Sequence, residues 1–328
     1  MPMPFMLAPM AELSHRALRE LIEGFGGCDE YFTEMISAGA LLGGGPFESY
    51  YIDGGPCPER VVYQLTGSDP EQLAEAAALL DRKTCAGIDL NMGCSAPAIV
   101  RTGAGVGWMA SIDRAGALIA RVRRRVKKRL SVKLRIGPGD DFDYLAAFCR
   151  RLEAEGLDLI TLHPRTAREK FRRRPRWEYI PRLRGLLHIP LAGNGDIASA
   201  EELARRADGG EKDGAWDALM VGRLAVRCPW VFAQARAMED AAGRAPAPFP
   251  ALINLEETAL RFLDLLARYQ PPEFHLSRAR RFFAYFCGNL KWAHHVNTLL
   301  NREISLSALA ARLSAYFRES PEEALYRL

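Results

Sequence analysis

The sequence lacks long apolar stretches. In its 328 residues, no uninterrupted apolar run reaches about 18 residues, the length that a membrane-spanning helix needs. The opening stretch MPMPFMLAPM is apolar but has neither a basic flank nor an extended hydrophobic centre, so we expect no signal peptide. We therefore expect no association with a membrane.

The sequence also lacks a C-x-x-C pair. An odd number of cysteines without that spacing argues against a disulfide framework and against a zinc site. We expect free thiols, no metal, and a location in the reducing cytoplasm. The seven cysteines are Cys28, Cys57, Cys85, Cys94, Cys149, Cys228 and Cys287.

A strong overall charge is absent too. The net charge of +4 is too small to indicate nucleic-acid binding by itself, but it is distributed unevenly. Residues 1–60 hold three arginines against nine aspartates and glutamates, whereas RVRRRVKKR at 121–129 and RTAREKFRRRPR at 165–176 are dense in positive charge. Taken alone, each basic segment is more typical of a solvated surface than of a binding site.

Short apolar runs alternate with helical patterns through residues 1–243, which we assign to one catalytic domain. Helical periodicity is clearest at 70–83, at 143–156 and at 199–206, where Ser199 and Glu202 have the spacing of a capping box. Eight strands with intervening helices predict an α/β fold, the (β/α)8 TIM barrel. We expect strands at Phe5–Ala8, Tyr31–Thr33, Val61–Leu65, Gly87–Asn91, Ser131–Arg135, Leu159–His163, Pro190–Asn194 and Ala218–Val221.

A proline-rich segment at 244–253 follows the predicted barrel and is typical of a semi-rigid linker. Residues 254–328 then show helical patterns only, which predicts a small all-α helical-bundle domain. The expected helices lie near 254–269, 275–295, 305–318 and 321–327.

Polar residues collect where the predicted strands end, which is where TIM barrels carry their active sites. Packing alone does not explain polar groups at six consecutive strand ends. Glycine-rich turns with Asn194 and Arg223 resemble a phosphate-binding corner, and Gln64, Lys133 and His163 suit a flat heteroaromatic ring. We therefore expect a phosphorylated cofactor, flavin mononucleotide (FMN). The residues at the strand ends are Pro9, Met10, Gln64, Asn91, Cys94, Lys133, Arg135, His163, Arg165, Asn194, Asp196, Gly222 and Arg223.

Cys94 differs from the other cysteines because it follows Gly93 at a strand end, within the expected site. An ordinary free thiol has a pKa of about 8.5 and keeps its proton at neutral pH, which suits a general acid. A nucleophile would need a lowered pKa. A small core residue is the alternative, and it is the role we assign to the other six cysteines.

Seven segments spread along the chain are LAPMAELSHRALR, QLTGSDP, DLNMGCSAPAIVRTGAG, VKLRIG, LHPRT, GNGDI and VGRLAVRCPWVF. In order and spacing they resemble the signatures of the tRNA-dihydrouridine synthase family. The resemblance implies an FMN barrel with a helical tRNA-binding domain at 254–328. It also implies that NADPH reduces the flavin, that the flavin gives hydride to C6 of a uridine, and that a cysteine protonates C5.

On this resemblance, Cys94 stands at the position of the catalytic cysteine. Family positions that contact the flavin correspond to Pro9, Met10, Ala11, Gln64, Lys133 and His163, and those on the phosphate side to Asn194, Gly195, Asp196, Gly222 and Arg223. The chain departs from the family pattern at Glu12, which replaces a glycine, at His15, which replaces an aspartate, and at Pro164, which replaces a common glycine. It also departs after the cysteine, at Ser95, Pro97 and Ala98.

The basic segment at 165–176 leaves the same barrel mouth and would attract an RNA backbone. Phe171 and Trp177 could stack on a base or could pack in the core. We expect a monomer that binds its substrate through Asn91, Arg135, Arg165, Arg168, Lys170, Arg172 and Arg280.

Two other functions fit the residues less well. A flavin barrel acting on a free small molecule, in the manner of dihydroorotate dehydrogenases, would not need the arginine-rich segment. An RNA-binding protein without catalysis would not need Cys94 together with a complete flavin set.

Overall fold

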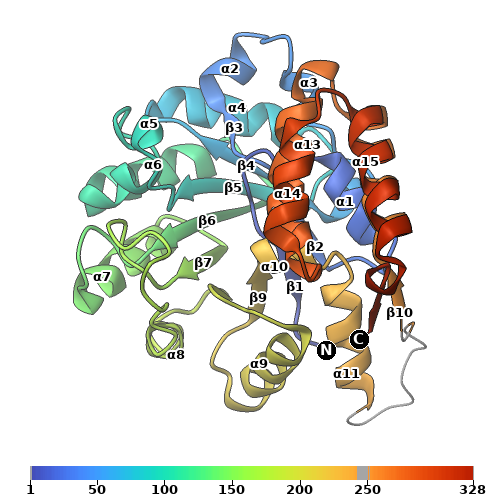
Figure 1. Ribbon diagram of the computed structural model, residues 1–328. Helices are drawn as coiled ribbons and strands as arrows, with labels where there is room; N and C mark the ends of the chain where they lie inside the picture. The colour runs from blue at the N-terminus through green and yellow to red at the C-terminus, as the bar shows by residue number, and fades with distance from the viewer. Residues whose placement is uncertain (1, 242–249, 251, 328) are drawn as a thin grey trace.

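The computed structural model describes residues 2–241, 250 and 252–327 (Figure 1). In this part of the chain, nine parallel strands form one sheet that closes on itself, because β2 pairs both with β1 and with β4. The short strand β3 continues beside β4 where β2 ends, so β2 and β3 share one of eight positions in the ring. The predicted TIM barrel is confirmed. The strands are β1 Phe5–Leu7, β2 Glu30–Phe32, β3 Ile36–Ser37, β4 Val61–Thr66, β5 Gly87–Met92, β6 Arg129–Arg135, β7 Leu159–His163, β8 Leu191–Asn194 and β9 Ala218–Val221.

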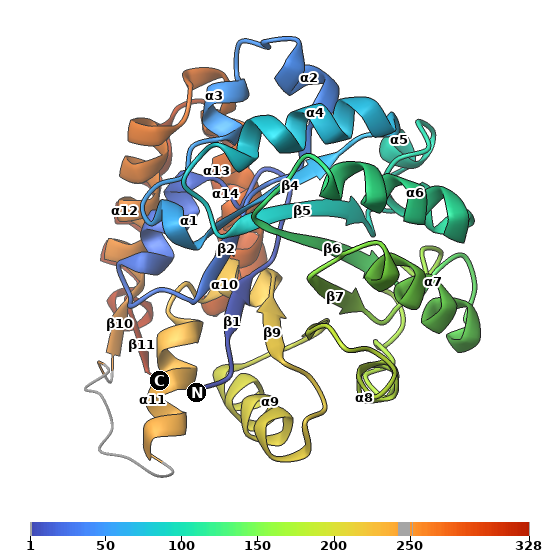
Figure 2. The ribbon, with the colours of Figure 1, turned by 180° about the vertical axis from the view of Figure 1, so that it is seen from behind.

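Helices surround the ring of strands, as the two opposite views show (Figures 1 and 2). The predicted cap at Ser199 forms, because its side chain accepts a hydrogen bond from the N–H of Glu202. Asp69 also caps a helix, by accepting from the N–H groups of Glu71 and Gln72. The helices that follow the strands are α1 Arg16–Glu23, α2 Ala38–Leu42, α3 Glu48–Tyr51, α4 Pro70–Asp81, α5 Pro97–Val100, α6 Ile112–Arg123, α7 Phe142–Ala154, α8 Tyr179–Arg184, α9 Ala200–Asp213, α10 Arg223–Arg227 and α11 Val231–Ala241.

The central strands are buried on both faces. All six residues of β4 and all six of β5 are buried, because side chains fill the interior of the ring and helices cover its exterior. Polar side chains within these strands therefore need partners inside the barrel. This requirement matters for Gln64, Asp89 and Asn91, which are described below.

The C-terminal part of the chain is helical and packs against α1 of the barrel (Figure 2). The stacked rings of Phe262 and Phe282, with centroids 3.7 Å apart, join α12 to α13. The helices are α12 Leu255–Tyr269, α13 Pro272–Phe286, α14 Ala293–Arg302 and α15 Leu306–Glu319. In the described residues, no helix is both long and apolar enough to cross a membrane.

The expected helix at 321–327 is wrong. A short 3-10 turn at Pro321–Glu323 is followed by strand β11 (Leu325–Arg327), which pairs antiparallel with β10 (Leu252–Asn254). The ring of Tyr326 packs near that of Trp230, a contact with the barrel that local periodicity cannot reveal. Most of the expected linker at 244–253 lies outside the described residues.

A buried ion pair ties the helical region to the barrel. Arg278 of α13 donates a hydrogen bond of 2.8 Å to Glu34, just after β2, and their side chains are only 2% and 4% exposed. Nearby, burial and then the charges of Arg278 and Arg19 hold the pKa of His15 well below its ordinary value. His15 is therefore neutral, and Glu34 supplies the negative charge that the buried arginines require.

Candidate active site at the barrel mouth

Cys94 lies in the loop after β5, half-buried, with its backbone held on both sides. Its N–H donates to Oδ1 of Asn91 at 3.0 Å, and its carbonyl accepts from the N–H of Val106, also at 3.0 Å. Gly105 has a φ of +59°, and a Cβ at that position would lie 2.5 Å from the carbonyl oxygen of Cys94. Glycine is therefore required there, and the thiol is presented by a fixed loop.

Below Cys94, buried side chains form a chain of hydrogen bonds. Asn91 donates from Nδ2 to Oε1 of Gln64 at 2.8 Å, and Gln64 donates from Nε2 to Oδ2 of Asp89 at 2.7 Å. Ser131 donates to the other oxygen of Asp89 at 2.6 Å. Sequence reasoning missed Asp89. The available signal was a carboxylate inside an apolar strand, two residues before Asn91 and hence on the same face.

Lys133 stands beside Asn91 in the register of β5 and β6. Among the described residues, its ammonium has no hydrogen-bond or ion-pair partner. Burial, followed by the charge of Arg135, lowers the pKa of Lys133 to about 8, against the opposing effects of Asp89 and Cys94. A half-buried cation without a partner favours a ligand that brings oxygen or nitrogen acceptors.

Arg135 and His163 end neighbouring strands of the barrel. Arg135 donates from Nε to the carbonyl of Gly93 at 3.0 Å, and from Nη1 to the carbonyls of Thr166 and Lys170 at 3.2 Å. It thereby connects the Cys94 loop to the basic segment.

His163 is buried, and its Nε2 lies 3.2 Å from Nη1 of Arg165. Because a guanidinium only donates, this nitrogen accepts and Nδ1 carries the proton. Burial, followed by the charges of Lys133 and Arg135, holds the pKa of His163 well below its ordinary value. The ring is therefore a neutral donor at the mouth.

The turn after β8 contains Asp196, which binds two arginines from neighbouring strand ends. Asp196 accepts from Arg165, with a 2.9 Å bond to Nη1, and from Arg223 at 2.7 Å. Arg165 is only 1% exposed, whereas Arg223 is accessible. Asn194 donates to the carbonyl of Met220 at 2.8 Å. Gly195, at φ +136°, lets the backbone pass close to His163, because a Cβ would lie 3.2 Å from the ring.

The turn after β1 lies against the turn after β9. Pro9 and Met10 are half-buried and Ala11 is exposed. A Cβ at Gly222 would lie 3.5 Å from the sulfur of Met10. The structure therefore brings the ends of the first and last barrel strands together, as closure of the ring requires.

Phe171 and Trp177, which the sequence could not separate, have different surroundings. Trp177 donates from Nε1 to the carbonyl of Gly195 at 3.0 Å and stacks under Arg206, so it packs within the structure. Phe171 is 57% exposed, and its ring faces three guanidiniums. Their central carbons lie 4.5, 5.8 and 5.9 Å from its centroid and belong to Arg223, Arg135 and Arg165.

The basic segment contributes exposed cations next to Phe171. Arg168, Lys170 and Arg172 are exposed, whereas Glu169 is engaged by Arg176 at 2.7 Å. Arg280 lies away from this segment on α13, where it donates to the carbonyl of Glu303 at 3.0 Å. The structure therefore gathers the predicted strand-end residues and the basic segment at one mouth, and leaves Arg280 in the helical region.

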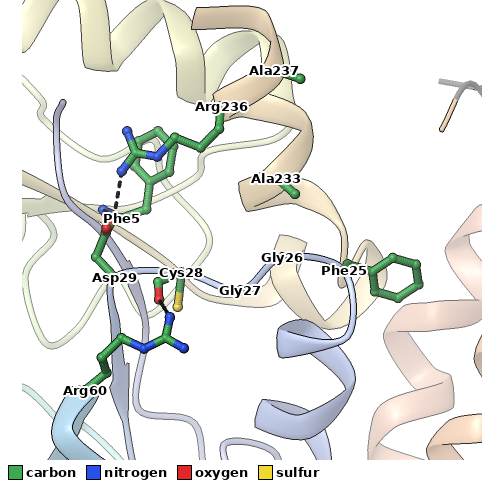
Figure 3. Close-up of a pocket in the computed structure, with 10 residues that line it drawn as sticks. All are labelled: Phe5, Phe25, Gly26, Gly27, Cys28, Asp29, Arg60, Ala233, Arg236 and Ala237. Atoms are coloured by element: carbon green, nitrogen blue, oxygen red, sulfur yellow. Dashed lines mark hydrogen bonds and ion pairs between the residues drawn. The ribbon is translucent and has the colours of Figure 1, made fainter. Parts of the chain in front are cut away.

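A hollow at the opposite end of the barrel contains charged groups that are paired with one another. There Asp29 accepts from the N–H of Phe5 and from Arg236, both at 2.7 Å, and Arg60 donates to the carbonyl of Cys28 at 2.9 Å (Figure 3). Phe5 begins β1, and Asp29 and Arg60 directly precede β2 and β4, so the hollow lies at the end of a TIM barrel that serves stability. The hollow is lined by Phe5, Phe25, Gly26, Gly27, Cys28, Asp29, Arg60, Ala233, Arg236 and Ala237.

All seven cysteines are free. In the described part of the chain, no group of three or more His, Cys, Asp and Glu side chains is arranged to hold a metal ion. The mouth thus combines one thiol, one neutral imidazole and several cations with buried amides and the carboxylates of Asp89 and Asp196.

Comparison with known proteins identifies the family. The family model described as dihydrouridine synthase matches residues 6–318. A probable tRNA-dihydrouridine synthase of Aquifex aeolicus is 31% identical, over 71% of this chain and 73% of its own. A tRNA-dihydrouridine(16) synthase of Ralstonia nicotianae is 32% identical, over 69% and 70%. A tRNA-dihydrouridine synthase B of Xanthomonas campestris is 27% identical, over 95% and 92%. The chain therefore belongs to the dihydrouridine synthase family of flavin-dependent oxidoreductases.

Proposed function

We propose that this protein reduces the C5=C6 bond of a uridine in tRNA, with FMN as its flavin and NADPH as its reductant. The observation that carries the proposal is the combination, at one mouth, of the half-buried thiol of Cys94 with the cations Lys133 and Arg135. In the described residues, neither cation has a carboxylate partner. A small neutral substrate would need the thiol but not the cations. A polyanion needs both if one of its bases is to be reduced.

The mouth residues fit a flavin mononucleotide. Lys133 and the Nδ1–H of His163 offer donors to the carbonyl oxygens and nitrogens of the ring, and Met10 offers an apolar surface. The bound flavin would supply hydride to C6 of the uridine. On the phosphate side we propose Arg223 with the turn Asn194, Gly195 and Asp196 and with Gly222, and beside the ring Pro9, Ala11 and Gln64.

Cys94 is proposed as the general acid that delivers a proton to C5 of the uridine. Its backbone is fixed by Asn91 and Val106, so the sulfur has a defined position relative to a ring bound in the mouth. General acids placed in this way contribute about 10²–10⁴-fold to a rate. Asn91, which is nearly buried next to the loop, is proposed to contact the uridine as well.

The basic segment is proposed to hold the RNA backbone through Arg168, Lys170 and Arg172, whose side chains are exposed. Extruding a base from folded RNA costs a few kcal/mol. Stacking of the extruded base or its neighbour on Phe171 would offset part of this cost, at about 1–3 kcal/mol per base. The contacts of Arg135 and Arg165 favour a positioning role at the edge of the substrate site.

Residues 1–243 would form the catalytic domain, and residues 254–328, with Arg280, would extend the tRNA-binding surface beyond it. We further propose that the protein works as a monomer in the cytoplasm. The seven free cysteines support a reducing environment.

Two measurements test the proposed function. Purified protein should be yellow with flavin absorbance and should release FMN on denaturation. Mapping of dihydrouridine in tRNA from cells that lack the gene should show one class of site restored to uridine. Unchanged dihydrouridine at every position would refute the proposal, and a protein that takes up no flavin would refute it more broadly.

A further inference from the structure

The hydrogen-bond chain beneath the loop joins a buried carboxylate to the backbone of the proposed general acid. It runs from Asp89 through the amides of Gln64 and Asn91 to the N–H of Cys94, with donor–acceptor distances of 2.7, 2.8 and 3.0 Å. We propose that Asp89 is a positioning residue that holds Cys94 in place through these two amides. As far as it concerns catalysis, the inference rests on the proposed function.

The direction of each hydrogen bond follows from the carboxylate at the inner end. A carboxylate only accepts, so Gln64 must turn its NH2 group toward Asp89 and its carbonyl oxygen toward Asn91. Asn91 must then turn its NH2 group inward. Its own carbonyl oxygen is left facing the N–H of Cys94, which needs an acceptor. The charge on Asp89 thus sets the orientation of two amides, although Asp89 does not touch the loop.

The surroundings of Asp89 keep it an acceptor near neutral pH. Ser131 of β6 and Gln64 of β4 donate to its two oxygens, and the charges of Lys133 and Arg129 favour its ionised form. Burial acts in the opposite direction and raises its pKa to about 6. Protonation would add an O–H donor to this carboxyl group, so Asp89 would no longer require the NH2 group of Gln64 and the orientation of the amides would no longer be fixed.

The isosteric variant Asp89→Asn tests this inference on the flavin-loaded protein. Ser131 donates to residue 89 at 2.6 Å, and its alternative acceptor, the carbonyl of Ile88, is 3.5 Å away. Asn at 89 should therefore keep its oxygen toward Ser131 and turn its NH2 group toward Gln64, which inverts both amides and sets the NH2 of Asn91 against the N–H of Cys94. We expect iodoacetamide to alkylate Cys94 about tenfold faster once this hydrogen bond is broken. Peptide mass spectrometry resolves Cys94 from the other cysteines. A rate within twofold of wild type would overturn the proposal.

The double variant Asp89→Asn with Asn91→Asp provides the sharpest control. The inverted Gln64 can then donate to Asp at 91, which also accepts from Cys94, so every partner is satisfied in the reversed direction. Alkylation should return toward the wild-type rate. A double variant as reactive as the single one would show that hydrogen-bond direction is not the cause.

Thr161→Val is the matched core control, because Thr161 pairs with Lys133 on the next strand and, in the described residues, its buried hydroxyl has no hydrogen-bond partner. It should leave alkylation of Cys94 unchanged. Should Asp89→Asn fail to fold, as judged by circular dichroism, Asn91→Leu removes the last acceptor directly and should give the same acceleration. Wild-type reactivity in Asn91→Leu would equally reject the inference.

Alkylation requires neither tRNA nor NADPH, so the inference and the proposed function can fail separately. If wild-type protein reduces no uridine but the variants alter Cys94 as expected, only the proposed function falls. If uridine is reduced, Asp89→Asn should lower kcat about tenfold and leave KM for tRNA unchanged. Normal kcat together with a normal alkylation rate would show that Asp89 does not position Cys94.

Discussion

The two ends of the barrel treat charge differently, and strand β6 shows the contrast along a single element. At its start, Arg129 meets Glu30 with hydrogen bonds of 2.5 and 2.6 Å. At its end, Arg135 donates to backbone carbonyls and faces the ring of Phe171. In the described residues, neither Arg135 nor Lys133 has a carboxylate partner. The paired charge at the base of β6 serves the fold, whereas Lys133 and Arg135 at the mouth remain available to an anionic ligand, although Arg165 and Arg223 nearby pair with Asp196.

The largest expected effect separates two cysteines at opposite ends. Cys94→Ala should keep flavin and fold but lower kcat for uridine reduction by about 10²–10⁴-fold, as removal of a general acid does. Cys28→Ala, in the hollow at the base, should leave kcat unchanged and cost about 1 kcal/mol of stability. Single-turnover kinetics and urea unfolding measure both. Near-normal reduction by Cys94→Ala would reject the general-acid role.

A second pair of variants compares the ends of β6. Arg129→Met leaves Glu30 largely buried without its partner and should cost about 3 kcal/mol of unfolding free energy. It should spare kcat at pH 8, where Asp89 stays ionised without the help of Arg129. Arg135→Met frees the Cys94 loop and should lower kcat about tenfold, with a stability decrease of about 1 kcal/mol. Equal effects of the two variants on stability and on kcat would contradict the division between base and mouth.

Salt dependence distinguishes the two basic segments. Replacing Arg168, Lys170 and Arg172 with serine should weaken tRNA binding and flatten the plot of log affinity against log salt by about 0.7–0.9 for each phosphate that the variant no longer neutralises. The control replaces Arg121, Arg124 and Arg125 with serine. Arg121 and Arg125 pair with Glu71, so this face should not alter the slope. An identical slope change in both triple variants would show that the basic segment at 165–176 has no special role in binding RNA.

The smallest expected effect is a pH dependence from Asp89. Its pKa is raised to about 6, so uridine reduction should halve near pH 6 and fall further below it as the acceptor is protonated. Stability responds with the opposite sign. Because ionisation is disfavoured in the fold, this group's contribution to stability rises as pH falls from above 6 toward its ordinary value of 3.8. In Asp89→Asn the acidic limb should disappear from the kcat–pH profile.

The sequence predicted the elements that local patterns determine. All eight barrel positions were correct, because apolar runs and a cap such as that at Ser199 are local signals. The strand-end residues could be collected because barrel topology brings strand ends together. The role of Asp89 could not be predicted, because it depends on the register of three strands. The exposure of Phe171 and the packing of Trp177 could not be predicted either, because they depend on neighbours distant in sequence. Strand β11 was missed for the same reason.

The ion pair between Glu34 and Arg278 bears on how much of this chain can be removed. A protein cut before Leu255 would lose this guanidinium and would also uncover Glu34 and the face of α1 against which α12 packs. Shortening the chain to the barrel alone would thus destabilise the barrel beside its first two strands. The barrel and the C-terminal helical region should consequently unfold in one transition, and evolution could not readily exchange the helical region alone.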